Sequence, residues 1–518
     1  MSLIVAGTTA IIVAFLLWHY CYQLFFSPLA RIPGPLIYAL TGWRLAYEDY
    51  KGDRSRTLHK LHSKYGPVVR VGPDEVSFNS TSALRVIYGA GSEFERTGFY
   101  RMFDVAGRPN LFSFASRKAH RDRKRILAHA YAKSGMLKGD TAALIEKKVR
   151  IYLELIEREG PTSNIFNSLH YFSLDAITEF LYGQFGKTAC LQGVKADRAL
   201  IRAMANPDRR KLTWFSVHFL RFTEWLYTRD GALGCLARQF YPMQAPTTYM
   251  GIRHHALKAC QSFSAATSDE KNMEGSSALI ARLWQHHRSR KEGGMDDSDI
   301  ASECADHLMA GIETTSDTLM FVVWSLSRPE HRHFQKEVIE EVCAISENGT
   351  NADGIPRVEA SDKLPYVNAV IKETLRLFAP LPGSEPRSLP ISTTIDGYAI
   401  PPRTVVSMSP YILHRNPEIF PEPSRFNPDR WLDESQDQAE MKKLFWAFSS
   451  GGRMCIGIHL AMAEMTTMIA AIYRKYSTTT INGFDKASPG ISGRYEVFWD
   501  ETCSERREHE CWINFRSH

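Results

Sequence analysis

The sequence predicts a mainly α-helical protein with small β-sheets. Apolar residues recur at helical spacing in seven long stretches: 118–132, 139–158, 164–183, 245–266, 298–328, 330–346 and 363–378. Only two short segments have the alternation and turn residues of β-hairpins, so strands should be a minority. With 44% hydrophobic and 23% charged residues, the composition argues against extensive disorder. The length allows about three domains, or one large core around a buried cofactor.

The chain begins with an uncharged apolar segment. Residues 3–26 contain no Asp, Glu, Lys or Arg, and Trp18, Tyr20 and Tyr22 lie near their end. This length can span a bilayer, with the aromatic rings at an interface. A cleaved signal peptide is the alternative, but no Lys or Arg precedes the apolar run. We therefore expect residues 1–26 to be a membrane anchor.

The residues around this segment predict the orientation of the body. Arg31 and Arg44 follow the anchor, which places the rest of the chain in the cytosol. The nine cysteines have no framework spacing, as expected of free thiols in a reducing compartment. The sequons at Asn79 and Asn348 should then carry no glycan, and a mobility shift after endoglycosidase treatment would contradict this topology.

The sequence also predicts a proline-rich connector and two β-hairpins. Pro28 and residues 32–35 predict a stiff hinge over residues 27–40. Residues 68–71 and 75–78 flank a Gly-Pro-Asp turn, and residues 391–395 and 398–400 flank an Asp-Gly turn. Both pairs should form antiparallel strands.

Two other segments lie outside these elements. The polar stretch 286–299 is predicted to be a mobile surface loop. Region 209–227 places aromatic side chains after three cations, which suits either a membrane interface or packing in the core. Its residues are Arg209, Arg210, Lys211, Trp214, Phe215, Phe219, Phe222, Trp225 and Tyr227.

One cysteine lies in a glycine-rich turn before a helix. Cys455 is flanked by Gly451, Gly452 and Gly457, and apolar residues at helical spacing follow. The glycines allow positive φ and close approach of backbone N–H groups, and a helix N-terminus favours a thiolate. The alternatives are an inert packed cysteine, or half of a zinc site with His459.

The helix predicted over 298–328 carries the sequence Ala310-Gly311-Ile312-Glu313-Thr314-Thr315. Gly311 in mid-helix costs about 1 kcal/mol relative to alanine, so we expect it to mark the close approach of something flat. Thr314 beside Glu313 suits proton delivery, although a Thr pair on a helix is also ordinary.

A third motif is Glu373-Thr374-Leu375-Arg376, whose charged ends share a helix face. The prolines at 380 and 382 and the run Pro423-Ser424-Arg425-Phe426 follow it.

Together these motifs resemble the cytochrome P450 family. The segment 448–457 fits the haem-binding signature F-x-x-G-x-R-x-C-x-G, and 310–315 fits the oxygen-activation motif [AG]-G-x-[DE]-T-[TS]. E-x-x-R lies between them in the order that the family has, and the resemblance covers essentially the whole chain. The hinge, the helix at His120 and the tail 503–512 resemble filamentous-fungal members.

The resemblance implies the cytochrome P450 fold, with residues 41–518 as the haem-thiolate catalytic domain. Cys455 would be the axial ligand of the iron of haem b, and Thr314 and Glu313 would deliver protons. Cofactor contacts would come from Arg387, Arg453, Phe448, Gly451, Gly457, His120 and Lys124, and a buried triad from Glu373, Arg376 and Arg425. His120 and Lys124 depart from the family's W-x-x-x-R, and Ser424 stands where many relatives have Glu.

The implied activity is monooxygenation of a lipophilic small molecule. Electrons would come from NADPH through a cytochrome reductase, with cytochrome b5 as a further candidate partner, at the endoplasmic reticulum membrane. Lys124, Arg125, Lys442 and Lys443 offer a basic docking face, and their neutralisation should raise the apparent reductase requirement in a titration. The net charge of +6 is too small and dispersed to indicate a nucleic-acid binder.

The substrate class is predicted from the variable stretches 95–117, 200–225, 303–312, 379–386 and 488–495. Their apolar residues suggest a lipophilic secondary metabolite: Phe99, Tyr100, Phe103, Phe112, Leu308, Met309, Leu381 and Ile491. Fatty-acid or xenobiotic oxidation, a haem-thiolate isomerase or dehydratase, and a haem sensor are the alternatives.

Overall fold

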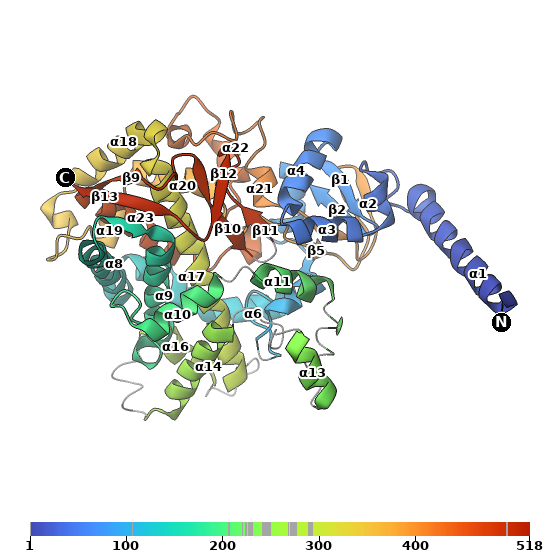
Figure 1. The fold of residues 1–518 in the computed structure, drawn as a ribbon, viewed down its shortest axis with the longest axis horizontal. Coiled ribbons are helices and arrows are strands. Elements are labelled where there is room, and N and C mark those ends of the chain that lie inside the picture. The colour runs from blue at the N-terminus through green and yellow to red at the C-terminus, as the bar shows by residue number, and fades with distance from the viewer. Residues whose placement is uncertain are drawn as a thin grey trace.

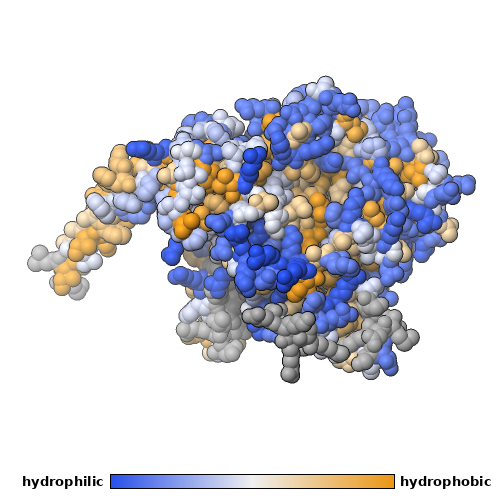
Figure 2. All heavy atoms as spheres, turned by 180° about the vertical axis from the view of Figure 1, so that it is seen from behind, coloured by the Kyte–Doolittle hydropathy of each residue, from blue (hydrophilic) through white to orange (hydrophobic). Residues whose placement is uncertain are grey.

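The computed structural model describes the chain except residues 1, 106, 206–207, 220, 223–224, 226–230, 241–249, 268, 270–276, 288–293 and 494–495. Helices form most of the body, and the sheets lie among them (Figure 1). Helix α1 (Ser2–Cys21) projects from the body as a separate rod and continues as a π-helical turn to Phe26. Residues Ile4–Phe26 form the one candidate membrane span in the described chain, and Figure 2 shows the hydrophobic surface of this rod.

The core is built around the 31-residue helix α17 (Asp297–Ser327). Its N-terminus is closed by a capping box in which Asp296 and Asp299 accept each other's backbone N–H groups. The helix ends two residues before Pro329, as the sequence predicts. Helices α9 (Ile165–Tyr182), α14 (Met250–Ala265) and α23 (Ile458–Lys475) pack against it, and α8 (Gly139–Glu159) packs against α9 and α23.

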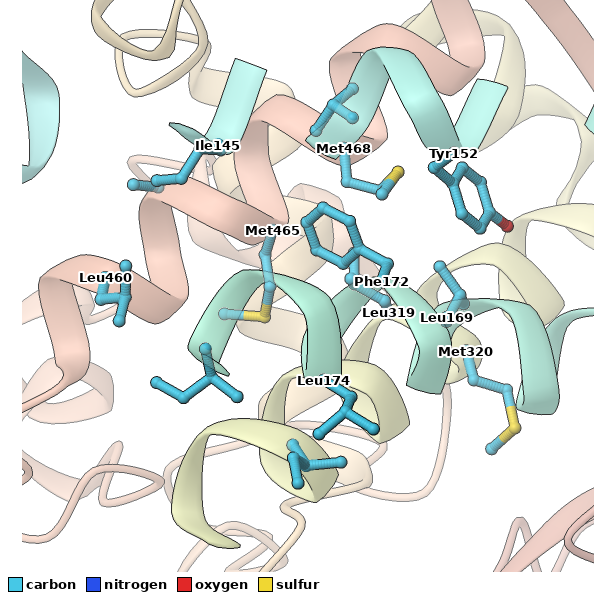
Figure 3. Packing of buried hydrophobic residues seen from close by; sticks show 14 of the residues in the cluster. Ile145, Tyr152, Leu169, Phe172, Leu174, Leu319, Met320, Leu460, Met465 and Met468 are labelled. Atoms are coloured by element: carbon cyan, nitrogen blue, oxygen red, sulfur yellow. The ribbon is translucent and has the colours of Figure 1, made fainter. Parts of the chain in front are cut away.

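Side chains from four helices meet in the centre of this core. Figure 3 shows Phe172 of α9, Leu319 of α17 and Met465 of α23 directed toward one another, with Tyr152 of α8 close by. All four side chains are at most 1% exposed. Burial of such side chains contributes roughly 1.5–3 kcal/mol each, so this layer fixes α17 relative to α23.

Gly311 has a different role from the one we expected. A Cβ atom at this position would lie 2.5 Å from Cγ1 of Ile177, so the residue that approaches closely is on α9. Ile177 is buried in the same core. The glycine therefore serves helix packing, and the expectation that it marks a flat neighbour is wrong.

The largest sheet has five strands in the order β1-β2-β8-β5-β3. Its first two strands, β1 (Val68–Gly72) and β2 (Glu75–Phe78), form the first predicted hairpin, with an irregularity after Arg70. Strands β6 (Thr393–Ile395) and β7 (Tyr398–Ile400) form the second, around Asp396 and Gly397, which both have positive φ. The sheets β11-β10-β12 and β4-β13-β9 were not predicted, and the second of them joins strands that are distant in sequence.

The remaining strands are β3 (Glu95–Arg96), β4 (Thr162–Asn164), β5 (Arg387–Ser388), β8 (Val405–Ser407), β9 (Tyr476–Thr480), β10 (Ala487–Gly493), β11 (Glu496–Phe498), β12 (Glu505–Glu508) and β13 (Trp512–Ser517). The remaining α-helices are α2 (Leu36–Leu40), α3 (Trp43–Lys51), α4 (Arg54–Tyr65), α5 (Thr81–Tyr88), α6 (Arg117–Leu127), α7 (Lys133–Leu137), α10 (Lys195–Met204), α11 (Asp208–His218), α13 (Ala232–Phe240), α16 (Leu279–His287), α18 (Arg332–Cys343), α19 (Val358–Ser361), α20 (Pro365–Leu377), α21 (Pro410–Leu413) and α22 (Gln438–Leu444). Short 3-10 turns occur at 98–103, 128–131, 183–185, 329–331, 347–349, 428–431 and 451–453.

Most predicted helices agree with these bounds within a few residues. The helix predicted over 118–132 is α6 followed by a 3-10 turn at 128–131. Residues 245–249 of another predicted helix lie outside the described residues. The predicted loop 286–299 overlaps α16 and the start of α17, and its centre, 288–293, also lies outside the described residues.

The aromatic region 209–227 is partly packed and partly exposed. Trp214 contacts Tyr50 and Phe219 contacts Trp43, at ring-centroid distances of 5.6 and 5.5 Å. Phe222 and Trp225 are exposed. Tyr227 and the side chains of 209–211 lie outside the described part. The packing interpretation therefore holds for Trp214 and Phe219, and the membrane interface stays a prediction for Phe222 and Trp225.

Candidate functional site

A backbone hydrogen bond closes the loop that contains Cys455. The Cys455 N–H donates to the Phe448 carbonyl at 2.9 Å, which closes the loop just before α23. The N–H groups of Gly457 and Ile458 donate to the sulfur. Burial raises the pKa of the Cys455 thiol, and these two donors and the Lys124 ammonium oppose that shift. The sulfur is nevertheless accessible, so it lies on the wall of an internal space.

One glycine of the loop is required by its neighbours. Gly451 has a φ of 61°, and a Cβ atom there would lie 2.4 Å from the Tyr88 carbonyl oxygen. Gly457 lies at the N-terminus of α23 with negative φ, and a Cβ there would meet the Cys455 sulfur at an ordinary 3.9 Å. Gly457 therefore matters through its N–H group.

Helix α6 brings Lys124 to the same loop. Its ammonium donates to the carbonyls of Gly452 and Met454 at 3.1 and 2.9 Å. Lys124 therefore fastens α6 to the turn around Cys455. Arg125, Lys442 and Lys443 are exposed, whereas Lys124 is half-buried and engaged, which removes it from the predicted docking face.

His120 lies one turn before Lys124 and is buried. Burial lowers the pKa of His120 to about 2, and Arg453, Arg96, Lys124 and Arg387 lower it further. The imidazole is therefore neutral and faces a cluster of cations.

Three buried or half-buried arginines form that cluster: Arg96, Arg387 and Arg453. Arg387 donates to the Tyr100 hydroxyl at 2.7 Å and pairs with Glu385 at 3.0 Å. Arg453 donates to the carbonyls of residues 114 and 115, both at 2.7 Å. Burial, followed by Arg96 and Arg387, lowers the pKa of Arg453 to about 9.

Arg96 was missed in the sequence. Its guanidinium donates to the carbonyls of Leu111 and Phe112 and lies 4.6 Å from the ring centroids of Tyr100 and Phe112. Its buried Nε has no hydrogen-bond partner in the part of the chain that the structure describes. Among the described residues, Glu385 is the one carboxylate that ion-pairs with the three arginines. Uncompensated buried cations are costly, so the cluster suits an anionic ligand.

Helix α17 carries the other two predicted site residues, Thr314 and Glu313. Both side chains are half-buried, and Ala310 is accessible although the helix from Thr315 onward is buried. The Thr314 hydroxyl donates to the Ala310 carbonyl at 2.7 Å, the usual back-bond of a helical threonine. A second internal surface is therefore accessible in the middle of the core helix.

The motif Glu373–Arg376 forms a fully buried bidentate ion pair, with distances of 2.8 and 2.9 Å. The third charged partner is Arg430, whose Nε donates to Glu373 at 3.1 Å. Trp431 and the N–H of Asn427 complete the carboxylate's contacts at 3.0 and 2.9 Å.

The prediction that Arg425 belongs to this triad is wrong. Its side chain is 63% exposed and pairs with Glu422, and only its backbone carbonyl accepts from Arg376 and Arg430. The sequence offers two candidates five residues apart, Arg425-Phe426 and Arg430-Trp431, each after a proline. Asp429 before Arg430 is the signal that could have favoured the second.

Comparisons with known proteins place these residues in a family context. A family model described as cytochrome P450 matches residues 32–490. The cytochrome P450 monooxygenase stcB of Emericella nidulans is 30% identical over 466 residues, covering 87% of this chain and 82% of that protein. The cytochrome P450 monooxygenase tazI of Aspergillus terreus is 27% identical, covering 93% and 94%. Tryptophan 6-hydroxylase fscE of Fusarium equiseti is 26% identical, covering 88% and 87%.

Proposed function

The chain belongs to the cytochrome P450 family, and we propose that it is an endoplasmic-reticulum-anchored monooxygenase that oxidises a lipophilic secondary-metabolite intermediate. Membership makes it an oxidoreductase that incorporates oxygen and implies a haem iron. The observation that carries the proposal is the accessible Cys455 sulfur, with two N–H donors, at the helix N-terminus. A thiolate ligand pushes electron density through iron to favour O–O cleavage.

The residues present fit a haem group by their chemistry. Cys455 would supply the iron ligand, and the N–H groups of Gly457 and Ile458 would lower its basicity. The surplus charge of Arg96, Arg387 and Arg453 would receive the haem carboxylates, and the unpartnered Arg96 Nε is a donor for this role. Lys124 would hold the loop itself.

Thr314, on α17, would deliver protons to the site where oxygen reacts. Its hydroxyl donates to the Ala310 carbonyl, and a change to another χ1 rotamer would release it toward the internal space. Glu313 would connect it to water. Thr314→Ala should raise NADPH consumption per product about tenfold while substrate binding changes little. Thr314→Ser should restore coupling, and unchanged coupling in the alanine variant would remove Thr314 from this role.

Electrons would come from NADPH through a separate reductase, with cytochrome b5 as a further candidate, at a face that includes Arg125 and Lys442. Metabolite profiling of a deletion strain would first identify the substrate. The direct test is then product formation in the complete mixture, compared with mixtures that lack NADPH, oxygen or the reductase. Product formed without oxygen and NADPH would instead indicate an isomerase or dehydratase.

Residues 1–26 would anchor the protein in the membrane. The body would contact the same membrane through four exposed apolar residues, Trp43, Phe222, Trp225 and Leu233. Deletion of 1–26 should move the protein from an integral to a carbonate-extractable membrane fraction, because the exposed apolar residues of the body would still contact the membrane. Extraction of the full chain by alkaline carbonate would contradict the anchor.

The lipophilic substrate class is supported by one aromatic cluster. Phe99, Tyr100, Phe103 and Phe112 form edge-to-face contacts with centroids 4.9–6.4 Å apart. Leu308 and Ile491, which we expected in the same cavity, are buried in the helical core. Fatty-acid or xenobiotic oxidation is the alternative.

A further inference from the structure

The accessible face of α17 extends beyond Thr314. Asp306, Ala310 and Thr314 are spaced by four residues and therefore share one face of the helix. Asp306 is half-buried while Ile300–Ala305 are buried, so this residue is accessible on the same face of α17 as Thr314. It lies eight residues from Thr314, about 12 Å along the helix axis.

The carboxylate next to Asp306 is already compensated. Glu303 is paired with Arg123, accepts from the Leu111 N–H at 3.1 Å and contacts His307 Nε2 at 3.2 Å. Ligand atoms of Glu303, Asp306 and His307 lie within 4.8 Å of one another, but Arg123 already supplies the cation. Within the described chain, Asp306 has neither a hydrogen bond nor an ion pair of this kind.

Asp306 is close to its titration point. Burial raises the pKa of its carboxyl group to about 7; His307, Arg96 and Arg253 oppose this, and Glu303 adds to it. Near neutral pH the group can therefore either donate or accept a hydrogen bond.

Arg253 reaches the same region from α14, which packs beside α17 (Figure 1). Its Nη1 donates a long hydrogen bond of 3.4 Å to the Asp104 carbonyl, and its buried Nε has no hydrogen-bond partner among the described residues. The charges of Arg253 and Asp306 interact, yet no ion pair within 4.0 Å joins these two described residues. Both residues are half-buried, so each keeps some accessible surface and some hydrogen-bonding capacity that the described chain does not use.

The charges of these two residues limit which ligand group they can bind together. A carboxylate would be repelled by Asp306, and an ammonium group by Arg253. A neutral oxygen can accept from Arg253 and exchange a hydrogen bond with Asp306. We propose that Asp306 and Arg253 determine specificity by binding a hydroxyl or carbonyl oxygen at the end of the lipophilic substrate remote from the oxidised carbon, a role that rests on the proposed function.

Iron-anchored ligands test this without knowledge of the substrate. The probes are 4-(biphenyl-4-yl)imidazoles whose terminal ring carries hydrogen, hydroxyl, carboxylate or ammonium, titrated by the spectral shift of nitrogen ligation. In the wild-type holoprotein the hydroxyl probe should bind about tenfold more tightly than the unsubstituted probe, and the two charged probes more weakly than the hydroxyl probe. Asp306→Leu and Arg253→Leu should each reduce the hydroxyl advantage below about threefold without changing the affinity of the unsubstituted probe.

Matched variants separate hydrogen bonding from loss of fold. Asp306→Asn should keep most of the tighter binding of the hydroxyl probe. Lys258→Leu, which removes an exposed cation from the helix that carries Arg253, should keep all of it. Equal binding of the hydroxyl and unsubstituted probes in a wild type that shows the thiolate carbonyl band would overturn this inference alone. Absence of that band together with absence of any ligand shift would overturn the proposed function, and this inference with it.

Discussion

Replacing Cys455 with alanine should abolish the red-shifted carbonyl band of a thiolate-ligated haem and reduce product formation to background. The reason is local: the N–H groups of Gly457 and Ile458 converge on this sulfur, and Lys124 adds the closest cation. In the described structure, the other eight cysteines are free thiols in other elements. Without the thiolate the haem should bind more weakly. It should not be lost entirely, because the arginine cluster would still receive its carboxylates.

The measurement is the reduced-plus-carbon-monoxide difference spectrum, with the haem-to-protein ratio recorded for each variant. Cys343→Ala is the matched control, since this cysteine is also exposed but lies at the end of α18. It should give the wild-type spectrum. A thiolate band that persists in Cys455→Ala would disprove the assignment of the iron ligand.

Short-range patterns in the sequence predict much of this fold. The hairpins around Gly72 and Asp396, and the bounds of α8, α9, α17 and α20, follow from turn residues and helical periodicity. The sheet that contains β4, β13 and β9 depends on pairing between segments up to about 350 residues apart, for which local patterns hold no information.

The candidate site was predictable where a motif fixes both residue and neighbour. Cys455, Thr314 and the Glu373–Arg376 pair lie at such positions. Arg96 and Asp306 could not be predicted, because an isolated charged residue does not reveal which other elements will surround it. Gly311 shows the opposite error: its identity was informative, but the neighbour that requires it, Ile177, lies 134 residues earlier on another helix.

The choice between Arg425 and Arg430 has a large expected effect on stability. Arg430→Leu should lower the free energy of unfolding by about 3 kcal/mol, because it leaves the fully buried Glu373 with less compensation than its desolvation requires. Arg425→Leu should change it by less than about 0.5 kcal/mol, since that side chain is solvent-exposed and its pair with Glu422 is weak.

The two variants form a matched pair, because both replace one arginine of the same segment with the same apolar side chain. Loss of the thiolate carbonyl band on heating the holoprotein would measure the stability of the haem pocket. Urea unfolding monitored by far-ultraviolet circular dichroism would measure the stability of the whole chain. Glu373→Gln should resemble Arg430→Leu in both assays, because Arg376 and Arg430 would then be the uncompensated groups. If Arg425→Leu instead proved the more damaging arginine variant, the side chain that completes this charge network would be Arg425, and the arrangement of residues 421–431 described above would be wrong.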